Sequence, residues 1–313
     1  MERIFDDLSS SFAGDSADAA VSLGNFDGVH VGHQALLEKN NRTAENAGLI
    51  RRVVTFEPHP RAVARDPGFR FIYSGRQKAA KIDSLGLCDE LVIMNFTREL
   101  KEMEPEDYFK QILIGRYHAK AITVGDDFRF GRFGRGDTRM LAEFCEREQI
   151  QLTVMPRVCL EGGPVSSSRI REYLEQGEME LAAELLGEPY QINGMVHQGK
   201  HVGRKLHTPT VNLWFDESQV IPRKGVYVSR IRIGQEHFTG VSNVGINPTF
   251  GGESPRVETF IFEFAKEVYG EDIGISLLHF LRPEHAFDSP EALKKQIDID
   301  INHAKAYFKG DLK

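Results

Sequence analysis

The sequence predicts two domains of different architecture: an α/β domain wound around a parallel sheet, then a small antiparallel β-barrel with a C-terminal helix. The chain has 313 residues, about twice the usual length of one domain. Up to residue 186, short apolar runs alternate with helical patterns, which is typical of strands joined by crossover helices. From residue 187 onward strand-like runs follow one another, which indicates antiparallel pairing.

The first part, residues 1–186, contains five strand-like runs that helical patterns connect. The expected strands are Ala19–Gly24, Arg52–Phe56, Asp89–Asn95, Ala119–Gly125 and Gln151–Pro156. The helical patterns lie near Val31–Ala47, Arg76–Leu85, Pro105–Arg116 and Thr138–Gln149. We therefore expect a parallel sheet covered by helices, in which ligands bind outside the carboxyl ends of the strands.

The second part, residues 187–313, contains six strand-like runs that turn residues separate, and we place the domain boundary near Leu186–Pro189. The runs are Tyr190–His197, Thr210–Phe215, Gly225–Ile233, His237–Val244, Val257–Phe264 and Ile273–Leu281. A final helix is expected after a cap at Asp288 or Ser289, with Pro290 in its first turn. Its apolar stripe consists of Leu293, Ile297, Ile301, Ala304 and Phe308.

Composition narrows the class of protein. Hydrophobic residues make up 41% of the chain and charged residues 27%, which excludes a disordered or fibrous protein. Lys plus Arg number 39 and Asp plus Glu 46, so the net charge of −7 argues against a protein that coats nucleic acid. Cys88, Cys145 and Cys159 form no C-x-x-C pattern, as expected in a reducing cytosol. Neither a secretory signal nor a membrane span is expected.

The most specific motif is the segment GNFDGVHVGH at residues 24–33, which follows an apolar strand and opens a helix. Its glycines allow the backbone to approach a ligand closely, and the free N–H groups of a helix N-terminus suit a phosphate. His30 and His33 share a face of the first turn, where two imidazoles can donate hydrogen bonds to a triphosphate. The alternatives are ordinary structural histidines or a metal pair, although no third ligand stands out.

Three further segments lie at expected strand exits or helix starts. The segment VSSSRIR at 165–171 offers hydroxyl and guanidinium groups to an anion, or is a plain serine cap with solvated arginines. The segment GDDFRFGRFGRGD at 125–137 can stack on a flat ring and contact phosphate, bind single-stranded RNA, or be a surface loop. The segment TFEPHP at 55–60 has a backbone fixed by two prolines, and its His59 is either a ligand contact or a loop residue.

Together, in this order, these segments resemble the nucleotidyltransferase half of the bifunctional riboflavin kinase/FAD synthetases, with its G-x-F-D-G-V-H-x-G-H, T-F-E-P-H-P, D-F-R-F-G and S-S-[ST]-x-I-R patterns. Ser168 stands where Thr is more usual. The resemblance implies a Rossmann-like domain over residues 1–186 that joins FMN to the AMP part of ATP. The implied catalytic residues are His30, His33 and Arg171. The implied ATP-binding residues are Gly24, Asn25, Phe26, Asp27, Gly28, Ser166, Ser167 and Ser168. The implied flavin-binding residues are His59, Asp126, Phe128, Arg129 and Phe130.

A second candidate site lies in the barrel half. Glycines recur at 194, 199 and 203, as in a phosphate loop, and Thr210 and Asn212 point to one side of a strand. Their oxygens either hold Mg²⁺ beside a nucleotide or form a polar strand face. Alternation places Glu258 on the face of Phe260, Phe262 and Phe264, where partial burial would raise its pKa toward that of a general base. The alternative is an exposed strand end.

This half resembles the riboflavin kinase module over residues 187–313, with its G-x-x-x-G-R-x-L-G-x-P-T-A-N and V-E-x-H patterns. The resemblance implies that Glu258 deprotonates the ribityl hydroxyl and that Thr210 and Asn212 hold Mg²⁺. The implied ATP-binding residues are Gly199, Gly203, Thr208, Pro209, Thr210 and Asn212. His207, Val211 and Thr259 depart from the usual Gly, Ala and His. The segment 247–250 matches a loop near the flavin.

We therefore expect a cytoplasmic enzyme that makes FMN from riboflavin and then FAD from FMN, using ATP and Mg²⁺ at both sites. No nucleic-acid or membrane partner is expected, and a homo-oligomer is possible. The alternatives are an FMN adenylyltransferase whose barrel only binds flavin or regulates, an RNA-binding protein, or an adenylyltransferase for another phosphate. The last would leave the barrel without a purpose.

Overall fold

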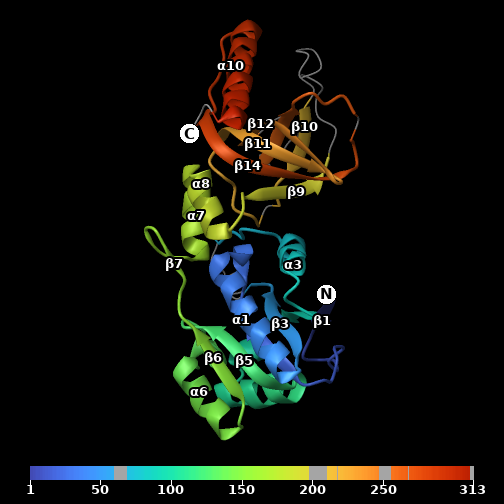
Figure 1. The fold of residues 1–313 in the computed structure, drawn as a ribbon, viewed down its shortest axis with the longest axis vertical. Coiled ribbons are helices and arrows are strands. Elements are labelled where there is room, and N and C mark those ends of the chain that lie inside the picture. Colours follow the sequence, from blue (N-terminus) through green and yellow to red (C-terminus); the bar gives the residue numbers. More distant parts are fainter. Residues whose placement is uncertain (60–68, 197–209, 217, 247–254, 267, 311–313) are drawn as a thin grey trace. The chain divides into compact units, whose positions relative to one another are not determined.

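The computed structural model describes residues 1–59, 69–196, 210–216, 218–246, 255–266 and 268–310. The chain forms two compact units, Met1–Ser166 and Ser167–Lys313. The predicted domain boundary near Leu186–Pro189 stays a prediction. The predicted fold classes of both parts are confirmed, as the two units show (Figure 1).

The first unit is built on a six-stranded sheet with the order β1-β4-β3-β2-β5-β6, in which all pairs are parallel. The five predicted strands are present as β2 Ala19–Leu23, β3 Ile50–Glu57, β4 Glu90–Asn95, β5 Ala119–Gly125 and β6 Gln151–Met155. The sequence analysis missed β1, Glu2–Asp6, an edge strand that pairs only with β4. A short hairpin, β7 Cys159–Leu160 and β8 Gly163–Pro164, was also missed.

Helices cover both faces of this sheet. On one face, α1 Val31–Ala47 and α3 Gly75–Ser84 bury apolar side chains against β3 and β4. On the other face lie α4 Arg98–Glu102, the helix η2 Tyr108–Arg116 and α6 Thr138–Arg147. Burial on both faces explains why the strands β2, β4 and β5 are largely apolar. Figure 1 shows α1 passing across the sheet beside β3.

The helix expected over Pro105–Arg116 differs in kind. It is a short α-helix, α5 Pro105–Asp107, followed by the nine-residue π-helix η2. The wider spacing puts Tyr108, Phe109, Ile112 and Leu113 together in the core. Apolar periodicity does not separate these two helix types, because both place such residues on one side.

The second unit begins with α7 Ser167–Gln176 and α8 Met179–Leu186, followed by a six-stranded antiparallel sheet with the order β10-β13-β12-β11-β14-β9. The strands are β9 Gln191–Met195, β10 Thr210–Trp214, β11 Gly225–Ile233, β12 Glu236–Ile246, β13 Pro255–Ile261 and β14 Asp272–Pro283. The edge strands β9 and β10 approach each other, because a Cβ at Gly194 would lie 3.7 Å from Leu213. The sheet is therefore a nearly closed barrel.

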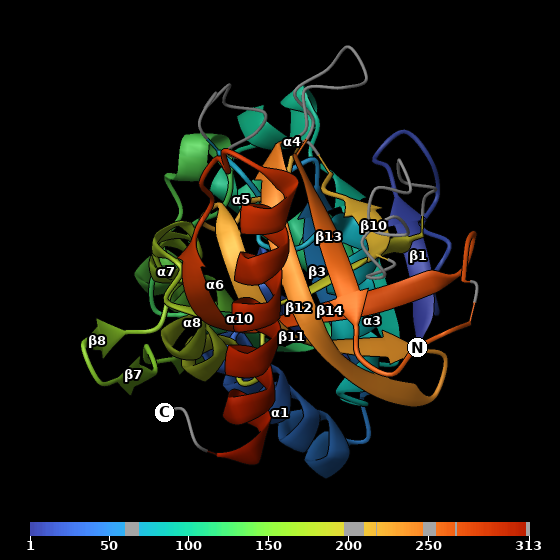
Figure 2. The same ribbon diagram turned by 90° about the horizontal axis from the view of Figure 1, so that it is seen from above.

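The C-terminal helix α10, Pro290–Lys309, lies along the outer face of β11 and β12 (Figure 2). The hydroxyl of Ser289 accepts a hydrogen bond from the Ala292 N–H, so Ser289 and not Asp288 is the cap. Ala304 of the predicted stripe is fully buried, and Ile301 and Phe308 pack against the same cluster.

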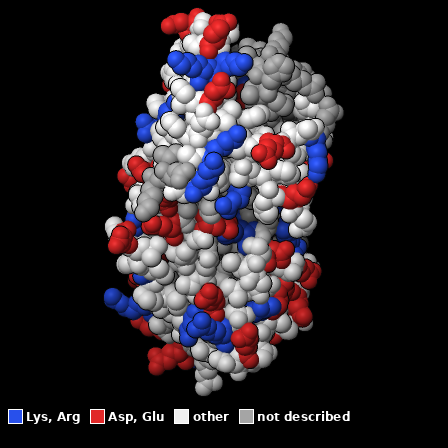
Figure 3. Space-filling view, turned by 45° about the horizontal axis from the view of Figure 1, so that its top comes forward, with Lys and Arg blue, Asp and Glu red and all other residues white. Residues whose placement is uncertain are grey.

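Acidic and basic side chains of the described residues alternate on the face shown in Figure 3, without a continuous basic surface there. This arrangement agrees with the net charge of −7. Among the described residues, no helix has the length and apolar character that a membrane span requires.

Candidate active sites

The H-x-G-H segment lies at the switch point of the parallel sheet. From β2 the chain winds outward through β3 and β4 on one side, and β5 pairs with β2 on the other. The carboxyl end of β2 leads into Gly24 and that of β5 into Asp126, so both predicted segments leave the sheet side by side. Such a switch point is where open α/β sheets bind ligands.

A tight turn, residues 24–30, connects β2 to α1. Phe26, Gly28 and Val29 have φ angles of 48°, 81° and 43°, all in the left-handed region. Only glycine adopts this region without strain, so the turn must be held by its surroundings. Phe26 and Val29 are fully buried, and the Asp27 carboxylate accepts a hydrogen bond of 3.0 Å from the Ile72 N–H.

The two histidine rings stack on each other at the start of α1. Their centroids lie 3.6 Å apart and their planes differ by 12°. His30 is the N-cap, and its Nδ1 accepts a hydrogen bond from the His33 N–H at 3.3 Å. A Cβ at Gly32 would lie 3.2 Å from His30 Nδ1. A side chain at position 32 would therefore crowd the His30 ring, which folds over that position.

Burial controls the protonation of this pair. It lowers the pKa of His30 from 6.5 to about 4. It also lowers the pKa of His33, to which the charges of His30 and Lys78 add. Both rings are therefore neutral imidazoles at pH 7 with one N–H each to donate, and His30 Nδ1 is already an acceptor. Donation from the two rings to a triphosphate stays a prediction. The ring nitrogen left to donate from His30 is Nε2. His33 Nδ1 is enclosed and has no hydrogen-bond partner among the described residues.

The predicted flavin contacts after β5 have different environments. Asp126 is exposed and accepts a hydrogen bond from Arg157 at 3.1 Å. Arg129 is exposed as well, and Phe128 is half-buried and stacks on Phe130. The Phe130 ring belongs to the core, where Gly136 leaves room for it. We therefore assign Phe130 to packing, while the flavin contacts of Phe128 and Arg129 stay predictions.

Two other predicted segments are only partly informative. His59 is buried and stacks on Phe69 at a centroid distance of 4.5 Å. Ser167 begins α7, Ser168 is exposed and Arg171 is half-buried. Ser166 ends the first unit, whereas these three residues belong to the second. Their role beside the histidines stays a prediction.

The sequence analysis missed Lys78 of α3. Its Nζ donates hydrogen bonds to Thr55 Oγ1 at 2.9 Å and to the Asn25 carbonyl at 3.3 Å. Burial lowers the pKa of Lys78, against the opposing charges of Asp27 and Glu57. Nothing in the sequence pattern singles it out, because its partners lie 23 and 53 residues away along the chain.

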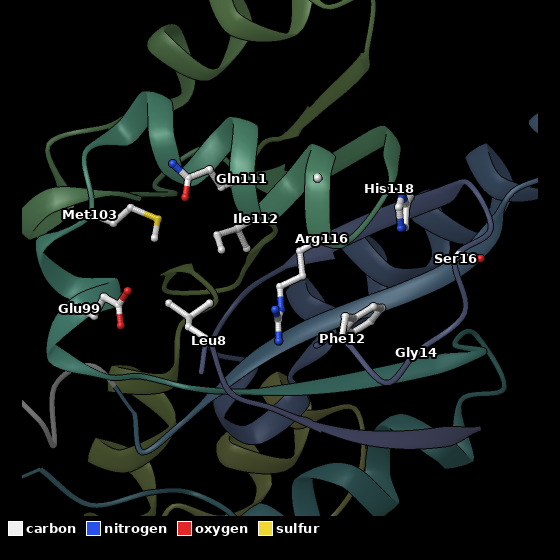
Figure 4. A pocket seen from close by; sticks show the side chains of 11 residues that line it. Leu8, Phe12, Gly14, Ser16, Glu99, Met103, Gln111, Ile112, Arg116 and His118 are labelled. Atoms are coloured by element: carbon white, nitrogen blue, oxygen red, sulfur yellow. The ribbon is translucent and has the colours of Figure 1, made fainter. Parts of the chain in front are cut away.

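A pocket of about 470 Å³ lies along η2, away from these residues (Figure 4). Leu8, Phe12, Met103 and Ile112 are its apolar lining. The Arg116 side chain points from η2 toward the N-terminal segment, where it binds the Asp6 carboxylate. No predicted site residue lines this pocket.

The second candidate site is the outward face of β10 and β13. Asn212 and Glu258 are directly opposite in the strand register, and the Thr210 hydroxyl donates a hydrogen bond of 2.7 Å to Glu258 Oε1. The alternative of an exposed strand end is excluded, because Glu258 lies in the middle of β13. Alternation places Glu258 and Phe260 together, and Phe262, directly after the end of β13, packs in the same cluster as Phe260 at a centroid distance of 5.8 Å. Phe264 instead packs on Phe238.

Three polar residues extend this face that the sequence analysis did not single out. Arg256 pairs with Glu258 Oε2 at 3.2 Å. Asn243 of β12 is opposite Glu258, and its amide donates a hydrogen bond of 2.8 Å to Glu284. The signal that could have found Arg256 is its spacing of two from Glu258, which puts both on one strand face.

The same face fits a divalent cation. Asn212 is 3% exposed, and its Oδ1 is enclosed without a hydrogen-bond partner among the described residues. The Thr210 oxygen retains its lone pairs while its O–H donates a hydrogen bond to Glu258. An unpartnered amide oxygen, a hydroxyl and a carboxylate on one face form the oxygen donor set that Mg²⁺ prefers.

Part of the predicted nucleotide site of the barrel lies outside the described residues. These residues are Gly199, Gly203, His207, Thr208, Pro209 and the segment 247–250. Val211 and Thr259 are opposite each other and buried on the other side of the strands from Glu258. Counting V-E-x-H from Val257 reaches Phe260, so the departure from His was wrongly placed at Thr259.

The fold and the two sites together define a two-part nucleotide-dependent transferase: a parallel α/β unit with an H-x-G-H turn at its switch point, and a barrel with a carboxylate beside a hydroxyl and an amide on one strand face. Residues 13–169 match the family model described as FAD synthetase, and residues 186–308 match the model described as riboflavin kinase. The chain belongs to the family of bifunctional riboflavin kinase/FMN adenylyltransferases.

The relatives cover nearly the whole chain. The bifunctional riboflavin kinase/FMN adenylyltransferase of Listeria monocytogenes is 32% identical over 291 residues, covering 92% of each chain. That of Bacillus subtilis is 33% identical over 299 residues, covering 94% of each. The crystal structure of a macrolide-efflux protein from Streptococcus pneumoniae has a TM-score of 0.84 and 31% identity, covering 95% of this chain and 97% of that one. This last likeness concerns the fold, and its name carries no activity over.

Proposed function

We propose that this protein phosphorylates riboflavin to FMN in its barrel and adenylylates FMN to FAD in its α/β unit, with ATP as the second substrate of both reactions. The observation that supports this most is that one chain carries two separate polar sites, while relatives that match more than nine-tenths of it bear both activities in their names. A carboxylate, a hydroxyl and an amide oxygen without a hydrogen-bond partner among the described residues, all on one strand face of the barrel, support the kinase half of the proposal.

In adenylyl transfer, a phosphate oxygen of FMN attacks the α-phosphorus of ATP and pyrophosphate leaves. Positioning and charge neutralisation supply most of the catalysis in such a displacement. Neutral His30 donates through Nε2 to the triphosphate, and the free N–H groups at the start of α1 point at the same anion. The role of Arg171 and the serines before it stays a prediction, because Ser167, Ser168 and Arg171 belong to the second compact unit.

In riboflavin phosphorylation, Glu258 accepts the proton of the terminal ribityl hydroxyl, whose oxygen attacks the γ-phosphorus of ATP, and ADP leaves. Thr210 and Arg256 hold the two carboxylate oxygens, which fixes the orientation of this base. Thr210 and Asn212 would hold Mg²⁺. A cation held there would supply positive charge to the transferred phosphate.

Chromatography of the products from riboflavin, ATP and Mg²⁺ tests the proposal. We expect FMN first and FAD afterwards. FAD formation from added FMN, with no FMN formed from riboflavin, would instead support a barrel that only binds flavin. A shift of labelled RNA without ATP turnover would support the RNA-binding alternative.

We also propose a cytoplasmic location and no nucleic-acid or membrane partner. The free thiols of Cys88, Cys145 and Cys159 support a reducing compartment. Fractionation of cells, with immunodetection of the chain, tests the location.

A further inference from the structure

The turn that presents the H-x-G-H backbone is strained, and something must hold it. Phe26 and Val29 are non-glycine residues with φ angles of 48° and 43°. Each such residue costs on the order of 1–3 kcal/mol and persists only where the surrounding structure enforces it. The burial of both side chains and the Asp27–Ile72 hydrogen bond are two constraints on this turn.

A third constraint comes from helix α3. Lys78 Nζ donates to Thr55 Oγ1 and to the Asn25 carbonyl, and the Thr55 hydroxyl itself donates to the same carbonyl at 3.1 Å. These three groups form a closed triangle at the carboxyl ends of β2 and β3. Helix α3 is itself fixed by a capping box between Ser74 and Gln77, so it provides a rigid base for the lysine.

The charge of Lys78 also reaches the histidine pair. Lys78 faces the carboxylates of Asp27 on η1, Asp27–Val29, and of Glu57 at the end of β3. His33 lies on α1. The charges of His30 and Lys78 lower its pKa, in addition to burial. The lysine thus touches the turn through Asn25 and acts electrostatically on its second histidine.

We propose that Lys78 is a positioning residue for adenylyl transfer: through Asn25 and Thr55 it holds the Gly24–Gly28 turn in the conformation that presents the start of α1 and His33 to the triphosphate of ATP. This inference rests on the proposed function of the α/β unit. It assigns a role to a helix that carries none of the sequence motifs.

The test compares Lys78→Met with Lys78→Arg, which keeps donors for both acceptors, and with Lys39→Met, an exposed lysine on α1. A displacement of the turn by about 1 Å is expected to cost on the order of 10- to 100-fold in kcat for FMN adenylylation. The KM for FMN should stay within about two-fold, because a positioning defect acts in the transition state. Lys78→Arg should recover most of the loss, and Lys39→Met should equal the unmodified chain.

The pH profile separates positioning from general destabilisation. Without the charge of Lys78, the pKa of His33 rises, so activity should be lost at a higher pH on the acid side of the kcat/KM profile. A merely structural role would lower activity without moving this limb. An unshifted limb together with full activity of Lys78→Met overturns the inference.

Two further variants keep the result decisive. If Lys78→Met does not fold, Thr55 provides the test. Thr55→Val removes only the bridging hydroxyl and should lower kcat, whereas Thr55→Ser keeps the hydroxyl and should not. Equal activity of these two variants would overturn the inference. His33→Ala tests the proposed site itself. Loss in His33→Ala with full activity in Lys78→Met refutes the lysine role alone, whereas full activity in His33→Ala refutes the site.

Discussion

Replacing Glu258 by Gln should abolish riboflavin phosphorylation and leave adenylylation intact. The change is nearly isosteric, and the Thr210 hydroxyl, now 2.7 Å from a carboxylate oxygen, can donate to the amide oxygen instead. Packing is therefore kept, while the proton acceptor and the partner of Arg256 are lost. A positioned general base is worth roughly 10²- to 10⁴-fold, which corresponds to about 3–5 kcal/mol in the activation free energy.

The assay follows FMN from riboflavin and FAD from added FMN in the same preparation. The second activity is the internal control, because the H-x-G-H site belongs to the other unit. Glu263→Gln is the matched control, since Glu263 follows β13 and is exposed. Equal loss of both activities, or FMN formation within about ten-fold of the unmodified chain, would refute the assignment of Glu258 as the base.

Three other predictions follow from buried polar groups. Burial lowers the pKa of His30 to about 4, so between pH 6.5 and 4 the unfolded chain binds a proton that the folded chain does not. Acidification through this range should therefore lower the free energy of unfolding by about 3 kcal/mol. Denaturant titrations should show a flatter pH dependence of this free energy in His30→Gln. Asn212→Ala should raise the Mg²⁺ concentration needed for FMN formation at least about ten-fold, measured by Mg²⁺ titration, while adenylylation keeps its Mg²⁺ dependence. Arg52→Met should lower the free energy of unfolding, measured in urea, by about 3–5 kcal/mol, because it leaves the Glu90 charge buried and unpaired. The double variant with Glu90→Gln should recover part of this loss. No recovery would contradict the reasoning.

The sequence predicted elements best where local signals agree. Helix α1 begins and ends at the predicted residues, because His30 caps its start and Gly48 its end. Strand β1 was missed because its Glu2–Asp6 segment carries charges, and it is held as an edge strand by pairing with β4, which the local sequence does not reveal. The π-helix η2 was missed because apolar spacing cannot resolve one extra residue per turn.

The candidate sites divide in the same way. The proximity of His30 and His33 was predicted from their spacing of three, whereas the stacking of the rings was not, because His30 is the extended N-cap. The shared face of Thr210 and Asn212 follows from a spacing of two on a strand. Lys78 could not be found, because its position depends on α3 packing beside two strand ends. The neutral state of the histidine pair also depends on burial, which the motif alone does not reveal.

Labelling the α-phosphate and the γ-phosphate of ATP in separate experiments is the most direct test of the whole account. With riboflavin as the flavin, label in the γ-phosphate of ATP should enter FMN and then FAD, whereas label in the α-phosphate should enter FAD alone. Label from the α-phosphate in FMN, or FMN that never carries the γ-label, would contradict the existence of two independent ATP-using sites in this chain.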